Sequence, residues 1–154
     1  MDAFSKDNSI LLRATRFDNP GDWIVEQQFV LQMGSSYLMA HGLGSPLVHD
    51  AETSFDIPSE GDYTMYVRTK NWTAFWSEGK TPGIFQVKVD GTTDEAEFGI
   101  GKKGDNRKER AQWYWQKGGV YHLSKGKHTI ALHDLMGLDG RCDAILFTQA
   151  EQAP

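Results

Sequence analysis

The stretch Asp62-Tyr-Thr-Met-Tyr-Val-Arg-Thr-Lys-Asn-Trp-Thr-Ala-Phe-Trp76 gives the clearest indication of the fold. Up to Thr69, the side chains alternate with the period of two that is typical of a β-strand. One face would carry Tyr63, Met65 and Val67, and the other face Thr64, Tyr66 and Arg68. Trp72 and Trp76 then follow in a loop, where small or polar residues are usual. These two rings are expected either to fold back onto the core or to offer a flat apolar surface to a ligand.

Short segments with strand character recur along the whole chain and are separated by turn residues. They are expected at 10–17, 23–25, 37–41, 53–57, 63–69, 84–90, 95–98, 112–116, 120–123, 128–135 and 142–148. Helical turns are expected only at 26–33 and 105–111. The pattern predicts an all-β fold, a two-sheet antiparallel β-sandwich of the jelly-roll type, in one domain over 10–149 with tails at 1–9 and 150–154.

Alternation within the strands also predicts which side chains fill the space between the two sheets. The expected core comprises Met65, Val67, Phe85, Val87, Val89, Ile130, Leu132, Ile145 and Phe147. The pair Asp90-Gly91 is a hairpin signal, because type I′ turns need positive φ at both central residues. Glycine-rich breaks are expected at 118–119 and 137–140.

Composition excludes several classes of protein. The 154 residues carry a net charge of −5, and the pI is near 5.5, which argues against a nucleic-acid partner. The sequence has no apolar run long enough to span a membrane and no signal-peptide pattern at its start. Cys142 is the single cysteine, so no internal disulfide is expected.

A set of motifs in a fixed order resembles an accessory domain of bacterial FAD-dependent oxidoreductases, which is itself similar to jelly-roll carbohydrate-binding modules. The motifs lie at 23–29, 32–35, 37–44, 66–72, 83–91, 113–115, 118–119, 131–135 and 140–145. The resemblance implies an exported, periplasmic or extracellular, β-sandwich that binds carbohydrate. It also leaves open a structural domain that packs against a flavin-dependent catalytic domain.

The segment Leu12-Arg-Ala-Thr-Arg-Phe17 departs from these relatives. Related modules often open with a Glu-Ala-Glu segment whose carboxylates can hold a structural calcium ion. Calcium prefers six to eight hard oxygen ligands, and Arg13 would repel the ion. No metal is therefore expected there, and the histidines lack the paired spacing of a metal site.

The candidate ligand site combines flat rings with charged donors, which is the mixture that sugar recognition needs. Its expected members are Trp72, Trp76, Arg68, Lys70, His41, Trp113, Trp115, Asp134 and Arg141. Strand alternation puts Trp113 and Trp115 on one face, which is either the core or a platform for a sugar ring. The basic residues of 102–110 lie beside these rings and either bind an acidic polysaccharide or remain solvated.

A catalytic role finds little support in the sequence. His133 and Asp134 invite comparison with a hydrolase, but neighbours on a strand point to opposite faces, and no GxSxG nucleophile motif is present. Asp134 and Asp143 are expected instead to hold backbone groups, with Arg141 paired to one of them. Gly99-Ile-Gly-Lys-Lys-Gly104 fits GxGxxG without the strand, helix and acid that nucleotide binding requires, so no cofactor is expected. A glycan-active enzyme that uses these carboxylates is the less favoured alternative.

Overall fold

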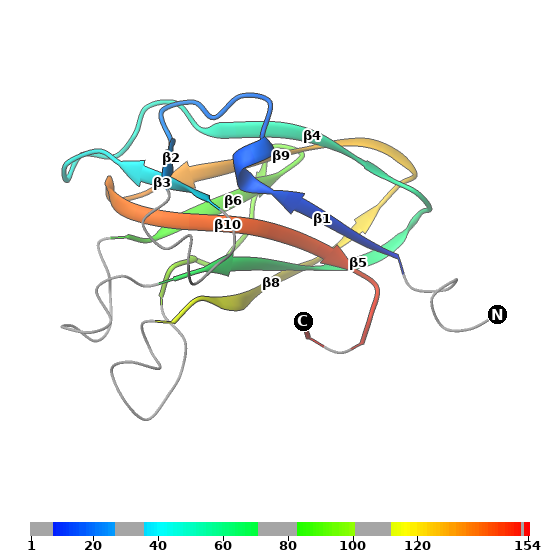
Figure 1. The fold of residues 1–154 in the computed structure, drawn as a ribbon. Helices are drawn as coiled ribbons and strands as arrows, with labels where there is room; N and C mark the ends of the chain where they lie inside the picture. The colour runs from blue at the N-terminus through cyan, green and yellow to red at the C-terminus, as the bar shows by residue number, and fades with distance from the viewer. Residues whose placement is uncertain (1–7, 27–35, 71–82, 101–111, 152) are drawn as a thin grey trace.

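The structure is a computed structural model that describes residues 8–26, 36–70, 83–100, 112–151 and 153–154. Two antiparallel sheets pack face to face as a β-sandwich (Figure 1). The larger sheet contains β1 (Ser9–Arg13), β2 (Ile24–Glu26), β3 (Tyr37–His41), β5 (Gly61–Thr69), β8 (Tyr114–Leu123) and β10 (Leu138–Thr148). The smaller sheet contains β4 (Ala51–Ile57), β6 (Phe85–Val89), β7 (Thr92–Thr93) and β9 (Gly126–Asp134).

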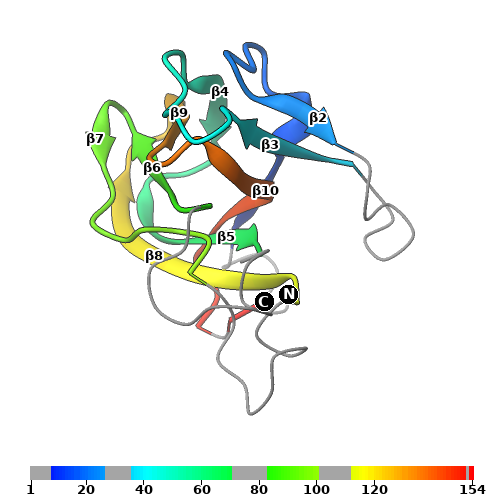
Figure 2. The same cartoon turned by 90° about the vertical axis from the view of Figure 1, so that its left-hand side faces the viewer.

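Strand order brings distant parts of the sequence together. In the larger sheet the order is β2-β3-β10-β5-β8, and in the smaller sheet it is β4-β9-β6-β7. One edge of β10 is shared, because β3 pairs with its first half and β1 with its second half. Figure 2 shows the two sheets curving around a common interior. These features confirm the predicted all-β sandwich, and the described residues contain no helix beyond the three-residue 3-10 turn η2 (Ala14–Arg16).

The hydrophobic core lies between the sheets and contains all nine predicted residues, from Met65 to Phe147. It is rich in aromatic rings: Phe55 stacks on Phe147 at 4.9 Å, and Trp23 meets Phe85 edge-on at 5.5 Å. Cys142 is buried in this core as a small residue, and burial raises the pKa of its thiol. Within the described residues, no helix is long and apolar enough to cross a membrane.

The predicted hairpin turn is correct, whereas several predicted breaks and strands are wrong: the strand expected at 10–17, for example, ends at Arg13, where η2 follows. Asp90 and Gly91 both have positive φ, at 51° and 82°, so the predicted hairpin is confirmed. The predicted break at Gly118–Gly119 is wrong, because β8 runs through both glycines. The break at 137–140 is also wrong from Leu138 onward, where β10 begins. The predicted strand 95–98 is wrong as well, since only Phe98 forms a bridge, to Phe85.

His128 fixes the turn between β8 and β9 to the β6–β7 hairpin. Its Nδ1 lies 2.7 Å from Asp90 Oδ2, and its Nε2 lies 2.7 Å from the Ser124 carbonyl oxygen. Both partners accept hydrogen bonds, so both ring nitrogens must carry hydrogen, and the imidazole is therefore a cation. Burial lowers the pKa of His128, but the bonds to Asp90 and Ser124 outweigh it and hold the pKa above its usual value.

A pH-dependent contribution to stability follows from this pair. Folding raises the pKa of His128, so the stabilisation by the His128–Asp90 pair is complete below the pKa of histidine in the unfolded chain, near 6.5. This stabilisation is lost as the pH rises through the pKa of His128 in the folded protein. We expect His128→Gln to cost about 1 kcal/mol at low pH and less at high pH, because Asp90 is half exposed and screened. Urea unfolding of both proteins between about pH 5.5 and pH 8.5 measures this difference. A constant difference would show that the ring is held as a neutral group.

Candidate functional site

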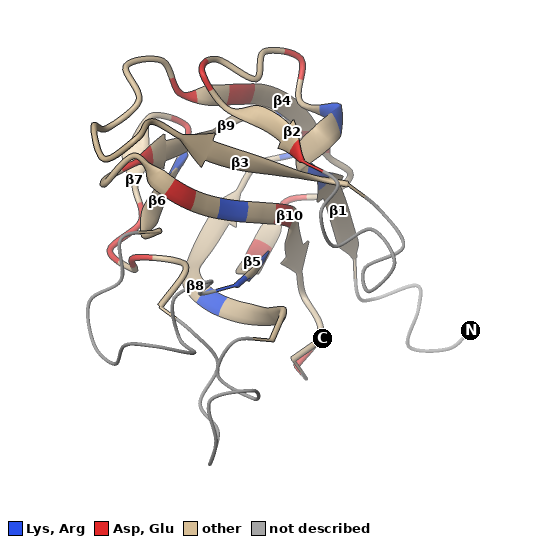
Figure 3. Cartoon of the chain, turned by 60° about the vertical axis from the view of Figure 1, so that its left-hand side comes forward, with Lys and Arg blue, Asp and Glu red and all other residues tan. Residues whose placement is uncertain are grey.

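Three predicted ligand residues meet on the outer face of the larger sheet, where β3, β5 and β10 lie side by side. Arg68 and Lys70 point out from β5 and its C-terminal end. The register of β10 with β5 pairs Cys142 with Thr69, so Arg141 lies opposite Lys70. Figure 3 shows Lys and Arg on β10 and β8 of this sheet.

Aromatic rings complete this arrangement. Trp113 packs edge-on against Tyr37 at 4.9 Å, and the Arg68 guanidinium carbon lies 5.9 Å from the centre of the Trp113 ring. Burial raises the pKa of the Tyr37 hydroxyl, and the positive charge of the nearby Arg141 opposes this shift. We call Tyr37, Arg68, Lys70, Trp113 and Arg141 the cationic–aromatic cluster. Tyr37 was not predicted as a site residue, although its position at the start of a strand and its aromatic ring resemble those of the predicted members.

Positive charge dominates this cluster. Burial lowers the pKa of Lys70 to about 8, and the positive charge of Arg141 adds to the effect. One carboxylate, Asp143, balances part of the charge: its Oδ2 lies 3.0 Å from Arg68 Nη1 and 3.5 Å from Arg13 Nη1. The Asp143 side chain is only 1% exposed. Two arginines thus hold the Asp143 carboxylate, and the expected bonds from Asp143 to backbone groups stay a prediction.

Trp115 of β8 and Trp113, which immediately precedes β8, lie on the outer face of the larger sheet. Trp115 pairs across the strands with Arg68, whereas Gln116 on the opposite face pairs with Val67 of the core. Both Trp113 and Trp115 are half-buried, and neither belongs to the core between the sheets. The predicted alternation is confirmed, and of the two alternatives the core placement is wrong.

The structure separates the remaining predicted site residues from this cluster. His41 lies at the end of β3, where its Nδ1 is 2.7 Å from Asp139 Oδ1. Asp134 is buried at the end of β9, and its Oδ2 accepts the Leu47 N–H at 2.8 Å, as expected for a backbone-holding residue. Trp72, Trp76 and the basic residues of 102–110 lie outside the described residues.

Groups for catalysis do not converge in the described part of the chain. His133 bonds Asp50 on the outer face, with Nδ1 2.9 Å from Oδ1, while Asp134 points inward. The prediction that this pair faces opposite ways is confirmed. No group of three His, Cys, Asp or Glu side chains that could hold a metal occurs among the described residues. The cationic–aromatic cluster can bind an anion and pack against a ring, but it offers no general base beside a nucleophile.

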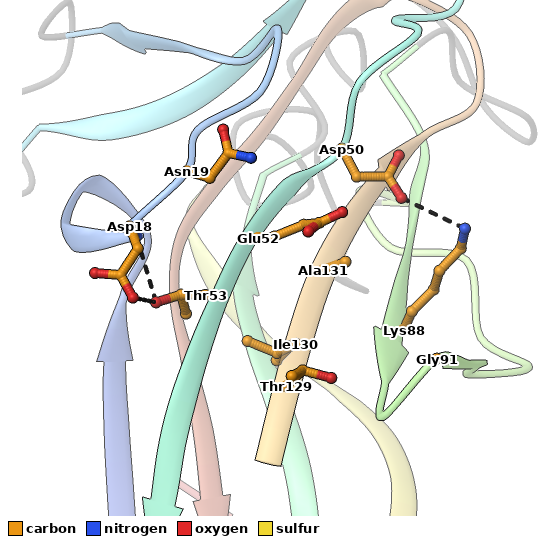
Figure 4. A pocket seen from close by; sticks show the side chains of 10 residues that line it. All are labelled: Asp18, Asn19, Asp50, Glu52, Thr53, Lys88, Gly91, Thr129, Ile130 and Ala131. Carbon is orange, nitrogen blue, oxygen red and sulfur yellow. Dashed lines mark hydrogen bonds and ion pairs between the residues drawn. The ribbon is translucent and has the colours of Figure 1, made fainter. Parts of the chain in front are cut away.

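Sequence reasoning missed a hollow of about 470 Å³ on the outer face of the smaller sheet (Figure 4). Seven of its ten lining residues have polar side chains, and the lining comes from the β1–β2 loop, β4, β9, β6 and the β6–β7 hairpin. The lining residues are Asp18, Asn19, Asp50, Glu52, Thr53, Lys88, Gly91, Thr129, Ile130 and Ala131. The available signal in the sequence is the polar half of the strand alternation, which places Glu52 and Lys88 on strand faces that point away from the core.

The Arg13–Asp143 contact bears on the expected lack of calcium. A guanidinium within 3.5 Å of the Asp143 carboxylate places positive charge where a cation would have to sit. We expect the melting temperature to be the same, within about 1 °C, with and without EDTA, because an ion that binds the folded state would raise it. Thermal unfolding with excess calcium and with EDTA checks this, and a drop of several degrees on chelation would contradict it.

Comparison with solved structures places the fold among carbohydrate-binding modules. The C-terminal CBM6 of LamC, a marine laminarinase from Zobellia galactanivorans, has a TM-score of 0.62 and 17% identity, covering 92% of this chain and all of that one. A family 35 carbohydrate-binding module from Clostridium thermocellum has a TM-score of 0.62 and 17% identity, covering 91% of this chain and 97% of that one.

The same fold also occurs as part of a longer enzyme. The Podospora anserina GH26-CBM35 β-(1,4)-mannanase matches with a TM-score of 0.64 and 17% identity over 95% of this chain, but over only 29% of its own length. No protein-family model and no curated protein matches the sequence. At these identities the likeness establishes the β-sandwich fold of such modules. The association with FAD-dependent oxidoreductases stays a prediction.

Proposed function

We propose that this chain is a non-catalytic carbohydrate-binding module and that its cationic–aromatic cluster holds an anionic glycan. The observation that carries the proposal is the meeting of three cationic side chains with two aromatic rings on one outer sheet face. The fold that the chain shares with carbohydrate-binding modules supports it. The module would act outside the cell, beside a polysaccharide-related catalytic partner.

The chemistry of the cluster favours a glycan with carboxylate or sulfate groups. The Arg68 side chain is 27% exposed, and its planar guanidinium can bind a carboxylate with two parallel hydrogen bonds. Arg141 is buried beside it and adds positive charge beneath the surface. Lys70 supplies a third cation at a half-buried position, where an anionic ligand would restore the charged form that burial disfavours. The half-buried ring of Trp115 offers an apolar surface next to these donors.

A glycan-array screen at neutral pH tests this proposal. We expect signals from uronate-containing or sulfated glycans, and weak or no signals from the same backbones after the acidic groups are removed. Addition of salt should weaken binding, because exposed charges are screened within about 10 Å at 0.1 M ionic strength. Equal signals from charged and neutral backbones would contradict an anionic ligand. If no glycan binds, the proposal that the chain is a carbohydrate-binding module is contradicted, and the alternative of a structural domain is favoured.

The loop tryptophans remain the predicted apolar part of the site. We expect Trp72→Ala to weaken glycan binding by about 1–3 kcal/mol and to leave the fold intact, as for truncation of an aromatic hot-spot residue. Trp76→Ala serves as the neighbouring comparison. Calorimetric titration gives the affinities, and circular dichroism checks folding. An unfolded Trp72→Ala protein, or one with unchanged affinity, would make this loop structural.

A further inference from the structure

A groove crosses the outer face of the smaller sheet (Figure 4). The cationic–aromatic cluster lies on the larger sheet, which is the other layer of the sandwich. The main hollow of the groove, of about 470 Å³, falls within the ~300–1,000 Å³ of small-molecule sites. A second hollow of about 290 Å³ shares four lining residues with it, Asn19, Asp50, Glu52 and Lys88. The two hollows therefore form one elongated groove, which suits a chain-like ligand.

Strand register builds the groove from side chains that are far apart in the sequence. Glu52, Ala131 and Lys88 lie in one row across β4, β9 and β6. The short side chain of Ala131 leaves room between the carboxylate and the ammonium group. Asn19 extends this row beyond β4, because its backbone forms two hydrogen bonds with Glu52. Hydrogen-bonding groups thus follow the groove from one rim to the other.

The groove has an excess of acceptors and of negative charge. Three carboxylates line it, and Asp50 is already paired, with its Oδ2 3.4 Å from Lys88 Nζ and its Oδ1 2.9 Å from His133 Nδ1. Asp18 accepts a hydrogen bond from the Thr53 hydroxyl at 3.0 Å. In the part of the chain that the structure describes, neither Asp18 nor Glu52 forms an ion pair. A ligand in this groove must therefore bring donors.

These requirements select the chemical class of the ligand. An apolar ligand would remove water from the carboxylates without replacing its hydrogen bonds, and an anionic ligand would meet like charge. We propose that the groove binds a glycan with free amino groups, such as a chain of glucosamine units. Its ammonium groups would meet Glu52 and Asp18, and its hydroxyls would meet Asn19 and Lys88. This site is separate from the anionic-glycan site proposed above.

Titration of the ¹⁵N-labelled protein with a glucosamine hexamer, followed by NMR, tests the inference. The matched probe is the N-acetylglucosamine hexamer, which has the same backbone without the positive charges. We expect the glucosamine hexamer to shift the amides of β4, β9 and β6 and to bind roughly tenfold or more tightly than the acetylated hexamer, as expected for charge-assisted hydrogen bonds.

Variants locate the binding on the groove. Glu52→Gln keeps the shape of the side chain and should weaken glucosamine-hexamer binding about tenfold, and Asp18→Asn should act in the same direction. Asp56→Asn is the matched control on β4, four residues or roughly 13 Å from Glu52, which exceeds the ~8–10 Å screening length in physiological salt. We expect the affinity of this control within about twofold of the parent.

Several results would overturn the inference: equal binding of the acetylated hexamer, no binding of the glucosamine hexamer, or unchanged affinity in both groove variants. Hexalysine provides a further test, because binding with equal affinity at the same amides would mean simple attraction of a polycation to an acidic protein. Retained binding of an anionic glycan by Glu52→Gln would show that the two sites are independent. Loss of both ligands would instead indicate damage to the fold.

Discussion

Arg68→Met is expected to destabilise the protein by about 3 kcal/mol, because it removes one partner of a buried ion pair. The Asp143 carboxylate is 1% exposed and lies 3.0 Å from Arg68 Nη1. Arg13, the other arginine beside this carboxylate, has its Nη1 3.5 Å away and its side chain 44% exposed. Loss of the Arg68 guanidinium therefore removes the shorter of these two contacts from a buried charge. Urea unfolding at neutral pH measures the loss.

A double variant separates the burial of charge from the loss of packing. Arg68→Met combined with Asp143→Leu removes both charges and should recover part of the stability, since a buried pair can often be replaced by apolar residues at little cost. Arg16→Met is the control, because Arg16 is an exposed arginine at the end of η2. We expect it to change stability by less than about 0.5 kcal/mol. A double variant less stable than Arg68→Met would show that packing of the arginine stem dominates.

Alternation predicted the core well on β6 and β9, because buried side chains alternate with more exposed ones along both strands. Met65 on β5 and Ile130 on β9 were assigned to the core from their period of two, and both are buried. The assignment of Trp113 and Trp115 needed more than alternation, which fixes that they share a face but not which face. Their place on the outer face follows from pairing with β5, where Arg68 lies opposite Trp115.

The error at Gly118–Gly119 has a specific cause. The two glycines are needed for space within β8 and not for a turn. A Cβ at Gly119 would lie 2.9 Å from Asp94 Oδ2, and a Cβ at Gly118 would lie 2.8 Å from Met65 Cε. The same aspartate ends the predicted strand 95–98, because its Oδ1 accepts the Ala96 N–H at 2.9 Å and the backbone turns there. Such tertiary contacts have no local signature in the sequence.

The two candidate sites differ in how much of each the sequence could reveal. Arg68, Lys70 and Trp113 stand out because cations and rings occur close together near strand ends. Glu52, Ala131 and Lys88 are each ordinary strand residues, and only the pairing of β4, β9 and β6 turns them into a groove. Strand order in a sandwich depends on long-range pairing, so the groove could be recognised only after the topology was known.

Binding of an anionic glycan is expected to weaken about tenfold or more between pH 7 and pH 9.5 as Lys70 loses its proton, since a hydrogen bond to a charged group contributes about 1.5–3 kcal/mol. The pKa of Lys70 is lowered to about 8, chiefly by burial and further by Arg141. Lys70 is therefore charged below that value and neutral above it. The Arg68 and Arg141 guanidinium groups stay charged throughout this range. Calorimetric titration with a uronate-rich oligosaccharide across this range measures the change.

Lys70→Arg isolates the cause of this pH dependence. A guanidinium remains protonated at pH 9.5, so the variant should hold its affinity where the parent loses it. Lys70→Met should bind weakly at both pH values, whereas Lys125→Met, at an exposed position in the β8–β9 turn, should keep both the affinity and the pH dependence of the parent. A decline of the same size in Lys70→Arg would assign the titration to another group. Such a result would remove Lys70 from the site and leave the arginines to account for charge recognition.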